Sequence, residues 1–260
     1  WNSRSNRKAI SLCCRTLLAF GALVVTDGCS LRPDFVPVEL RCEYLREPLG
    51  VDCLRPRFSW VIESERRGFR QSAYQVLVST SPEGLRLGEV DCWDTGKVDS
   101  SEQLNIEYGG KPLASHRRYY WKVRVWDEAG QASSWSQPAS FQVGLLQQGE
   151  WRAKWIADPD TSNRSPLIRK QFALKAKPAE AYAYVSALGY YELYINGQKV
   201  DARVLDPAPT QYERRALYST YDVAQLLQPG ANAVGLWLAE GQAAITLTRK
   251  DRYYNARRRY

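Results

Sequence analysis

The stretch YYWKVRVWDEAGQASS, residues 119–134, decides the fold class of this chain. From position 119 to 126, apolar residues alternate with polar or amphipathic ones. The apolar phase consists of Tyr119, Trp121, Val123 and Val125. An alternation of period two is typical of a half-buried β-strand. The sequence DEAG at 127–130 follows as a turn signal, so the stretch predicts one arm of an antiparallel hairpin.

Similar patterns recur outward from this stretch. Strands are predicted at 38–45, 58–62, 74–78, 93–98, 119–126 and 141–143, with a turn at 81–84. In the earliest of these strands, the apolar phase consists of Val38, Leu40, Cys42 and Tyr44. Short strands separated by turn signals, with no helical period, predict an antiparallel β sandwich over residues 36–146. Trp60 is expected to fill its core.

The second half of the chain is also rich in predicted strands, so the fold class is all-β. Tyr191, Leu193 and Ile195 alternate up to Asn196-Gly197, a dipeptide that favours a tight hairpin turn. Further apolar phases lie at 168–174 and 233–238. Asp222 is positioned to cap a short helical turn at 223–227. These signals predict a second β domain over residues 150–240.

The joint between the two predicted domains carries Trp151 and Trp155. Aromatic side chains at such a position either pack at a domain boundary or stack on a sugar. Packing is the interpretation that the sequence favours.

Four segments resemble the N-terminal region of bacterial α-L-rhamnosidases. They are LRCEYLREPLGVDCLRPRFSW at 40–60, YYWKVRVWDEAGQASSWSQPASFQVGLL at 119–146, GYYELYING at 189–197 and RALYSTYDVAQLLQPGANAVGL at 215–236. The resemblance implies a fibronectin-III-like or immunoglobulin-like sandwich followed by a jelly roll of the galactose-binding type. In that family both domains are non-catalytic and precede a large helical barrel.

The resemblance is interrupted at two places. The family typically continues with Gly-Trp-Thr where this chain has Ala208-Pro209-Thr210, and residues 239–243 replace an expected aromatic loop. Jelly rolls usually have about eight strands. At most six strands can be counted before Leu238, so the second domain is expected to be incomplete, followed by an atypical basic tail at 241–260.

The resemblance also implies an activity for a parent protein, which is hydrolysis of terminal α-L-rhamnose from glycosides. Glycosidases use two carboxyl groups on either side of the scissile bond. The candidate acidic residues are all expected to be turn residues: Glu63, Glu65, Asp91, Asp94, Asp127 and Glu128. In the family the catalytic carboxylates lie in the helical barrel, so the resemblance implies no catalytic residue in this chain. We expect an inactive N-terminal fragment whose partners are the missing catalytic domain and, through it, rhamnose-containing glycosides. The alternative is a non-enzymatic carbohydrate-binding or adhesive surface protein.

One carbohydrate site is a hypothesis for the second domain. Aromatic faces stack on sugar C–H groups, while carboxylates and hydroxyls bind sugar hydroxyls. The candidate residues are Tyr190, Glu192, Asp206, Thr210 and Tyr212. The competing interpretation is that the tyrosines belong to an ordinary half-exposed sheet and that Asp206 lies in a turn.

The net charge of +8 does not indicate a nucleic-acid partner. Residues 1–31 hold four basic residues against one acidic residue, and residues 249–260 hold six against one, so residues 32–248 are neutral by count.

The basic start and the apolar run LLAFGALVV at 17–25 predict an export signal over residues 1–30. Cys29 follows a small residue, as in a bacterial lipoprotein site. Lipidation of Cys29 would anchor the chain to a membrane, and an ordinary secretory signal is the alternative. The predicted location is exported: periplasmic, outer-membrane-anchored or extracellular.

The cysteine and histidine content predicts no metal site and no cofactor. Cys42, Cys53 and Cys92 lack the spacing of a zinc site. Cys42 is expected to be a small buried residue, with a Cys42–Cys53 disulfide as the alternative. His116 is the only histidine and is expected to be exposed in a polar loop.

Overall fold

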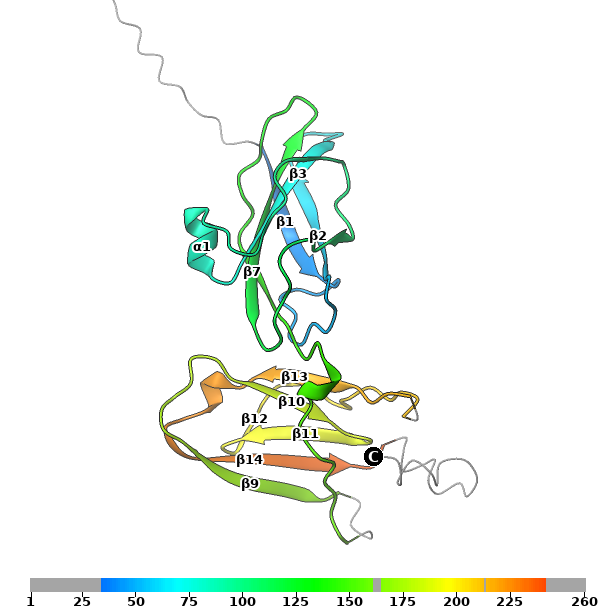
Figure 1. Cartoon of the computed structure of the whole chain (residues 1–260). Helices are drawn as coiled ribbons and strands as arrows, with labels where there is room; N and C mark the ends of the chain where they lie inside the picture. The colour runs from blue at the N-terminus through cyan, green and yellow to red at the C-terminus, as the bar shows by residue number, and fades with distance from the viewer. Residues whose placement is uncertain (1–33, 161–164, 213, 242–260) are drawn as a thin grey trace, which may run out of the picture. The chain divides into compact units, whose positions relative to one another are not determined.

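The computed structural model describes residues 34–160, 165–212 and 214–241 (Figure 1). The predicted export signal with Cys29 and nearly all of the basic tail lie outside the described residues. Strands dominate, as an all-β protein requires, and the chain builds two β sandwiches in succession.

The first sandwich contains eight strands arranged in two antiparallel sheets. The strands are β1 Phe35–Cys42, β2 Arg57–Ser64, β3 Gln71–Ser79, β4 Trp93–Asp94, β5 Val98–Asp99, β6 Ile106–Glu107, β7 Arg118–Asp127 and β8 Ala139–Gln142. One sheet has the order β1-β2-β6, and the other has the order β4-β3-β7-β8 with β5 also paired to β3. The long β3–β7 pair forms the centre of the second sheet.

The alternation in β7 closes the core as the sequence predicted. Trp121, Val123 and Val125 are fully buried. They pack with the buried apolar residues of β2, which lies in the facing sheet, and of β3, which is the neighbouring strand. Trp60 is buried among them, and its indole Nε1 donates to Gln71 Oε1 at 3.1 Å. Fully burying a side chain of this size contributes roughly 2–3 kcal/mol or more, so these positions dominate the stability of the sandwich.

Three local predictions for the first sandwich were wrong in detail. β1 ends at Cys42, and a register shift between Val38 and Arg41 breaks its alternation, so Tyr44 is exposed instead of continuing the apolar phase. The strand predicted at 93–98 is divided into β4 and β5, because Gly96 takes a positive φ of 60° between them.

The third difference is a short helix where a turn was predicted. Helix α1, Pro82–Leu87, begins after Ser81, whose Oγ accepts from Gly84 N at 3.0 Å. Pro82 suits the first helical position because it has no N–H to leave unpaired, and Gly88 ends the helix in the left-handed conformation. Because these caps stabilise both ends, the residues form a short helix where the sequence predicted a turn.

The second sandwich has six strands among the described residues. They are β9 Leu167–Leu174, β10 Tyr182–Ser186, β11 Tyr190–Ile195, β12 Gln198–Lys199, β13 Tyr218–Asp222 and β14 Gly230–Ala239. One sheet has the order β12-β11-β14-β9, and β10 pairs with β13 in the other. Asn196 and Gly197 both have positive φ in the β11–β12 turn, which confirms the predicted hairpin.

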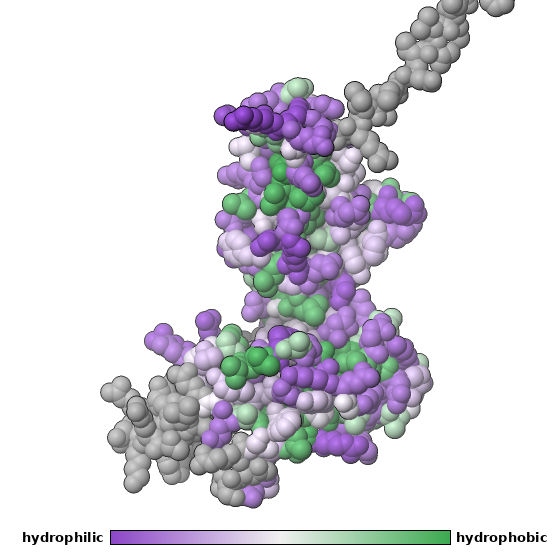
Figure 2. Space-filling view, turned by 180° about the vertical axis from the view of Figure 1, so that it is seen from behind, coloured by the Kyte–Doolittle hydropathy of each residue, from purple (hydrophilic) through white to green (hydrophobic). Residues whose placement is uncertain are grey.

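The core of the second sandwich forms between β11 and the segment that begins with β13. Tyr191, Leu193 and Ile195 project from β11, as their alternation predicted. They pack with a second set of buried residues, namely Tyr221, Val223 and Leu227. A 3₁₀ turn, η2 at Ala224–Leu226, joins β13 to β14. Its N-cap position is Val223 and not Asp222 as predicted, although the Asp222 carboxylate accepts from Ala224 N at 3.2 Å. Figure 2 shows that apolar residues are exposed among polar ones on the visible face of each sandwich.

The joint contains a second 3₁₀ turn, η1 at Gln148–Glu150, and several polar contacts. Arg118 Nη2 lies 2.9 Å from Asp222 Oδ2, and Leu145 N donates to the Tyr218 hydroxyl at 3.1 Å. Trp151 packs against the ring of Tyr218 at a centroid distance of 5.8 Å, whereas the side chain of Trp155 is exposed. The ring of Trp151 therefore packs at the domain boundary, as the favoured interpretation of the joint predicted.

Candidate functional site

Asp206, the central residue of the predicted carbohydrate site, is engaged inside the second sandwich. Its Oδ2 accepts from Ser219 Oγ at 2.6 Å and from the Tyr221 hydroxyl at 2.8 Å. The Tyr191 hydroxyl lies 3.4 Å from the same oxygen and 2.9 Å from the Tyr221 hydroxyl. Arg203 stacks on the Tyr221 ring at 4.1 Å and places its guanidinium 3.8 Å from Asp206 Oδ2. This arrangement ties the loop after β12 to β11 and β13.

The two tyrosines in this network remain protonated at neutral pH. Burial raises the pKa of Tyr191 to about 12, although hydrogen bonds with Tyr221 and Ser219 oppose the shift. Burial likewise raises the pKa of Tyr221, and its hydrogen bonds with Tyr191 and Asp206 raise it further. Each phenol can therefore donate, and the Asp206 carboxylate is a shared acceptor within the fold.

Glu192 and Tyr190 lie on the opposite side of β11 from Tyr191, because side chains alternate along a strand. Glu192 accepts from the Tyr194 hydroxyl at 2.6 Å and from Lys199 Nζ at 2.5 Å. The hydrogen bond with Lys199 lowers the pKa of Glu192 and keeps it ionised. This carboxylate therefore belongs to a surface network of the β11–β12 hairpin.

The remaining two predicted residues lie in the loop before β13. Thr210 Oγ1 donates to the carbonyl of Arg215 at 2.7 Å, which closes that loop on itself. Tyr212 is half-buried; burial raises its pKa, and the proximity of Tyr190 adds to the shift. The structure thus brings Tyr190 and Tyr212 near each other and leaves Asp206 with a different set of partners.

The acidic residues that could have served in catalysis have structural contacts or lie exposed. The Asp91 carboxylate accepts from Thr80 N at 2.9 Å, Thr80 Oγ1 at 2.6 Å and Ser79 Oγ at 2.8 Å. Burial acts to raise the pKa of Asp91, but these hydrogen bonds outweigh it and the pKa is lowered. A carboxyl group held ionised in this way is a poor proton donor.

Asp127 differs from the expected solvated turn residue because its side chain is buried. It accepts from Gln131 N at 2.8 Å and from Arg66 at 3.0 Å. Burial acts to raise the pKa of Asp127, but these partners outweigh it and the pKa is lowered. Glu63, Glu65 and Glu128 are exposed, as expected of surface residues.

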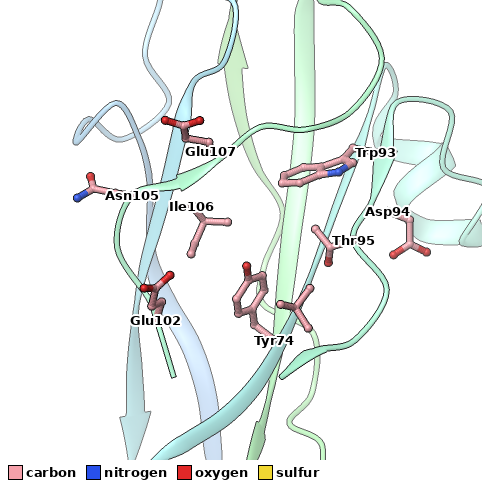
Figure 3. A pocket seen from close by; sticks show the side chains of 9 residues that line it. Tyr74, Trp93, Asp94, Thr95, Glu102, Asn105, Ile106 and Glu107 are labelled. Atoms are coloured by element: carbon pink, nitrogen blue, oxygen red, sulfur yellow. The ribbon is translucent and has the colours of Figure 1, made fainter. Parts of the chain in front are cut away.

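The structure contains a pocket in the first sandwich that no sequence pattern predicted (Figure 3). It has a volume of about 490 Å³. Its lining comes from β3, from β4 and β5, and from the segment around β6: Tyr74, Trp93, Asp94, Thr95, Val98, Glu102, Asn105, Ile106 and Glu107. No motif marks these residues, because they come from three separate parts of the chain.

The histidine and the cysteines of the described ranges are not arranged as a metal site. His116 is exposed, and its Nδ1 lies 2.9 Å from the Tyr184 hydroxyl. Cys42, Cys53 and Cys92 are free thiols, so the alternative prediction of a Cys42–Cys53 disulfide was wrong. Within residues 34–160, 165–212 and 214–241, no three His, Cys, Asp or Glu side chains are grouped to hold a metal ion. Nor do these residues form a helix with the length and apolar character that crossing a bilayer requires.

The two sandwiches define a tandem β-domain protein, and comparison with known families identifies each domain. Residues 37–147 match the N-terminal immunoglobulin domain of Rha78A-like proteins. Residues 176–260 match the α-L-rhamnosidase N-terminal domain. Over these ranges the chain belongs to the N-terminal region of the α-L-rhamnosidase family, which confirms the resemblance noted in the sequence.

Individual relatives agree with this assignment. An α-L-rhamnosidase of Formosa agariphila is 39% identical over 218 residues, which cover 75% of this chain and 23% of that protein. An α-L-rhamnosidase of Alteromonas sp. is 40% identical over 206 residues, covering 75% of this chain and 22% of the relative. The solved structure of an α-L-rhamnosidase from Dictyoglumus thermophilum superposes with a TM-score of 0.76 at 41% identity, covering 81% of this chain and 26% of that one. The chain therefore spans about a quarter of the length of these proteins.

Proposed function

We propose that this chain is the non-catalytic N-terminal region of an exported α-L-rhamnosidase, a glycoside hydrolase that removes terminal α-L-rhamnose from glycosides. The observation that carries the proposal is the succession of two domains of this family in one chain. Relatives named as α-L-rhamnosidases contain the same succession within about a quarter of their length.

The chemistry of the described carboxylates supports a scaffolding role. Hydrolysis of a glycoside requires a proton donor and a second carboxylate facing the same bond. Asp91, Asp127 and Asp206 instead accept several hydrogen bonds from the protein itself. In this proposal the two sandwiches support a catalytic domain elsewhere in the parent protein.

The proposal predicts that the purified chain does not hydrolyse an aryl α-L-rhamnoside. The release of the aryl alcohol is measured at high protein concentration, with near-UV circular dichroism of the same sample to show that the chain is folded. Turnover above a buffer blank by folded chain, retained through successive purification steps, would contradict the scaffolding role.

Export is the second part of the proposal, and it rests on the basic and apolar pattern of residues 1–30. Cell fractionation should find the chain outside the cytoplasm. If Cys29 is lipidated, the chain should incorporate a radiolabelled fatty acid, and Cys29→Ser should abolish the label. Accumulation of the whole chain in the cytoplasm would count against export, and an unlabelled exported chain would favour the ordinary secretory signal.

A non-enzymatic carbohydrate-binding or adhesive surface protein is the second candidate, favoured by the pocket in the first sandwich. The coding sequence downstream of Tyr260 distinguishes the candidates. A helical barrel with paired acidic residues supports the enzyme, whereas a stop codon supports a binding module. Further sandwiches in tandem would support an adhesive protein.

A further inference from the structure

The pocket of the first sandwich is an open depression with the volume of a small-molecule site. Its volume of about 490 Å³ lies within the range of about 300–1,000 Å³ that is typical of such sites. Ile106, Val98 and the aromatic rings of Trp93 and Tyr74 provide the apolar surface. Figure 3 shows Tyr74, Trp93 and Ile106 around the pocket, each coming from a different strand.

The aromatic walls are held in place by the core behind them. The Trp93 ring packs against Tyr108 at a centroid distance of 5.2 Å and an interplanar angle of 69°. The Tyr74 ring packs against Trp60 at 5.4 Å and 61°. Because Trp60 and Tyr108 are buried, the pocket presents rigid faces that need little ordering when a ligand binds.

Tyr74 presents a polar group to the pocket. The residue is only 8% exposed, and its hydroxyl, which has no hydrogen-bond partner among the residues that the structure describes, faces the pocket. Figure 3 shows this hydroxyl pointing between Ile106 and Thr95 toward Trp93. The hydroxyl faces the pocket and is accessible to water, so a ligand bound there would take the place of that water as its hydrogen-bond partner. Burial and the neighbouring Glu102 charge raise the pKa of Tyr74, which keeps the phenol protonated and able to donate.

Other lining groups are also available for hydrogen bonds. The Glu102 and Glu107 carboxylates make no hydrogen bond or ion pair within the described part of the chain. Asn105 Oδ1 accepts from the Tyr44 hydroxyl at 2.7 Å, and Figure 3 shows this side chain turned away from Tyr74. The same holds for Asp94: its Oδ1 accepts from Gln75 and Gly96, and Figure 3 shows it turned away from Tyr74.

We infer that this pocket binds a neutral saccharide. Sugar rings present C–H groups that pack on aromatic faces, and their hydroxyls both donate and accept hydrogen bonds. The pocket offers rings together with carboxylate acceptors and a phenol that can donate or accept. An anion would be repelled by the acidic side chains of the lining, and a simple cation would leave the phenol donor unused.

The site lies in the immunoglobulin-like domain and is distinct from the five residues predicted in the second sandwich. It would make this domain a carbohydrate-recognition module in addition to a scaffold. The inference does not depend on the parent protein's hydrolytic activity. A chain that binds no sugar would not contradict the proposed function. A parent protein without rhamnosidase activity would not contradict sugar binding in the pocket.

Saturation-transfer NMR on the full chain tests the inference, with L-rhamnose, D-galactose and D-glucose as separate probes. We expect transfer to ring C–H protons of at least one sugar. Tyr74→Phe and Glu102→Gln should each weaken its binding by roughly three- to tenfold, because each removes one hydrogen bond and leaves the core packing intact. Glu128→Gln, an exposed turn substitution away from the pocket, is the matched control and should bind like the unaltered chain.

Three results would overturn the inference. The folded chain could show no saturation transfer to any of the three sugars. Binding could be unchanged in both pocket variants, which would assign it to another surface. Finally, methylammonium could bind at the pocket more tightly than every sugar, which would make it a cation site. Near-UV circular dichroism of each variant separates loss of binding from loss of folding.

Discussion

The two β sandwiches bury their apolar residues to different degrees. In the first sandwich several core side chains have no exposed surface at all, among them Phe58, Val76 and Trp121. In the second sandwich the core residues retain a few per cent of exposure, and every residue of β10 is only half-buried. The first sandwich closes a core between two well-populated sheets, whereas the described part of the second places four strands against a two-stranded sheet.

The second sandwich therefore depends more on polar contacts. Because the hydrophobic contribution scales with the apolar area removed from water, a thinner core supplies less stability. The Asp206 network with Ser219, Tyr221 and Tyr191 and the Asn196–Asn232 side-chain pair at 2.9 Å hold loops that apolar packing alone would leave loose. Four predictions test this contrast, from the largest expected effect to the smallest.

The largest effect is expected in the core of the first sandwich. Trp121→Ala should lower the free energy of unfolding by about 3–5 kcal/mol, because it leaves a large cavity in a fully buried site. The indole Nε1 has no hydrogen-bond partner within the described residues, so the loss would be one of packing. Urea denaturation followed by far-UV circular dichroism measures it. Trp237→Ala, at a side chain 47% exposed in the second sandwich, is the control and should change stability by less than about 1 kcal/mol. If both variants lost the same free energy of unfolding, the proposed difference between the two sandwiches would be wrong.

A smaller effect is expected in the core of the second sandwich. Leu193 is 4% exposed, but many of its neighbours are only partly buried. Leu193→Ala should therefore cost about 2–3 kcal/mol, near the lower end for such substitutions, because the site can relax. The measurement is the same urea titration, and Leu167→Ala, at a side chain 75% exposed, should stay within about 0.5 kcal/mol of the unaltered chain. A cost above that of Trp121→Ala would show that the second core is the tighter one.

The polar network of the second sandwich gives the third prediction. Asp206→Asn should cost about 1–3 kcal/mol, because it replaces a charged acceptor shared by Ser219 and Tyr221 with an amide that cannot serve both equally. Thermal unfolding measures the change. Asp99→Asn is the control, since the Asp99 side chain is 88% exposed. If the two variants melt together, Asp206 has no structural role, and its carboxylate would be available to a ligand.

The smallest effect is a pH dependence in the first sandwich. The pKa of Asp91 is lowered in the fold, so its ionised form stabilises the sandwich at neutral pH. This stabilisation is complete above the unfolded-state pKa of about 4 and is lost as the pH falls below it. Asp91 is exposed, so solvent screening limits the contribution to about 1 kcal/mol or less. The urea midpoints of Asp91→Asn and the unaltered chain should differ at pH 7 and converge toward pH 2. A difference that persists at low pH would assign the stabilisation to something other than the charge.

Local pattern was enough to predict most of the strands and their buried faces. The alternations in β2, β3, β7 and β11 and the Asn196-Gly197 hairpin are confirmed because each depends only on neighbouring residues. The register shift in β1 depends on its pairing with β2, and periodicity within one strand does not reveal it. Helix α1 depends on a cap, and the same residues are also typical of a turn.

The candidate sites were much harder to predict. An aspartate in a loop, such as Asp206, is a common sugar ligand, but its partners lie on β11 and β13 and only folding brings them together. The pocket lined by Tyr74, Trp93 and Glu102 combines β3, β4 and a loop between short strands. None of these residues is unusual within its own segment.

The sequence by itself determined the all-β class, the order of the two domains and the family to which they belong. These properties follow from short-range alternation, turn residues and family-specific stretches, all of which are present in the linear chain. The tertiary structure alone decided which polar groups of the described residues are satisfied and which stay free. The hydrogen-bond partners of Asp206 and the unpartnered Tyr74 hydroxyl are set by distances between residues remote in sequence, and only the packed sheets fix those distances.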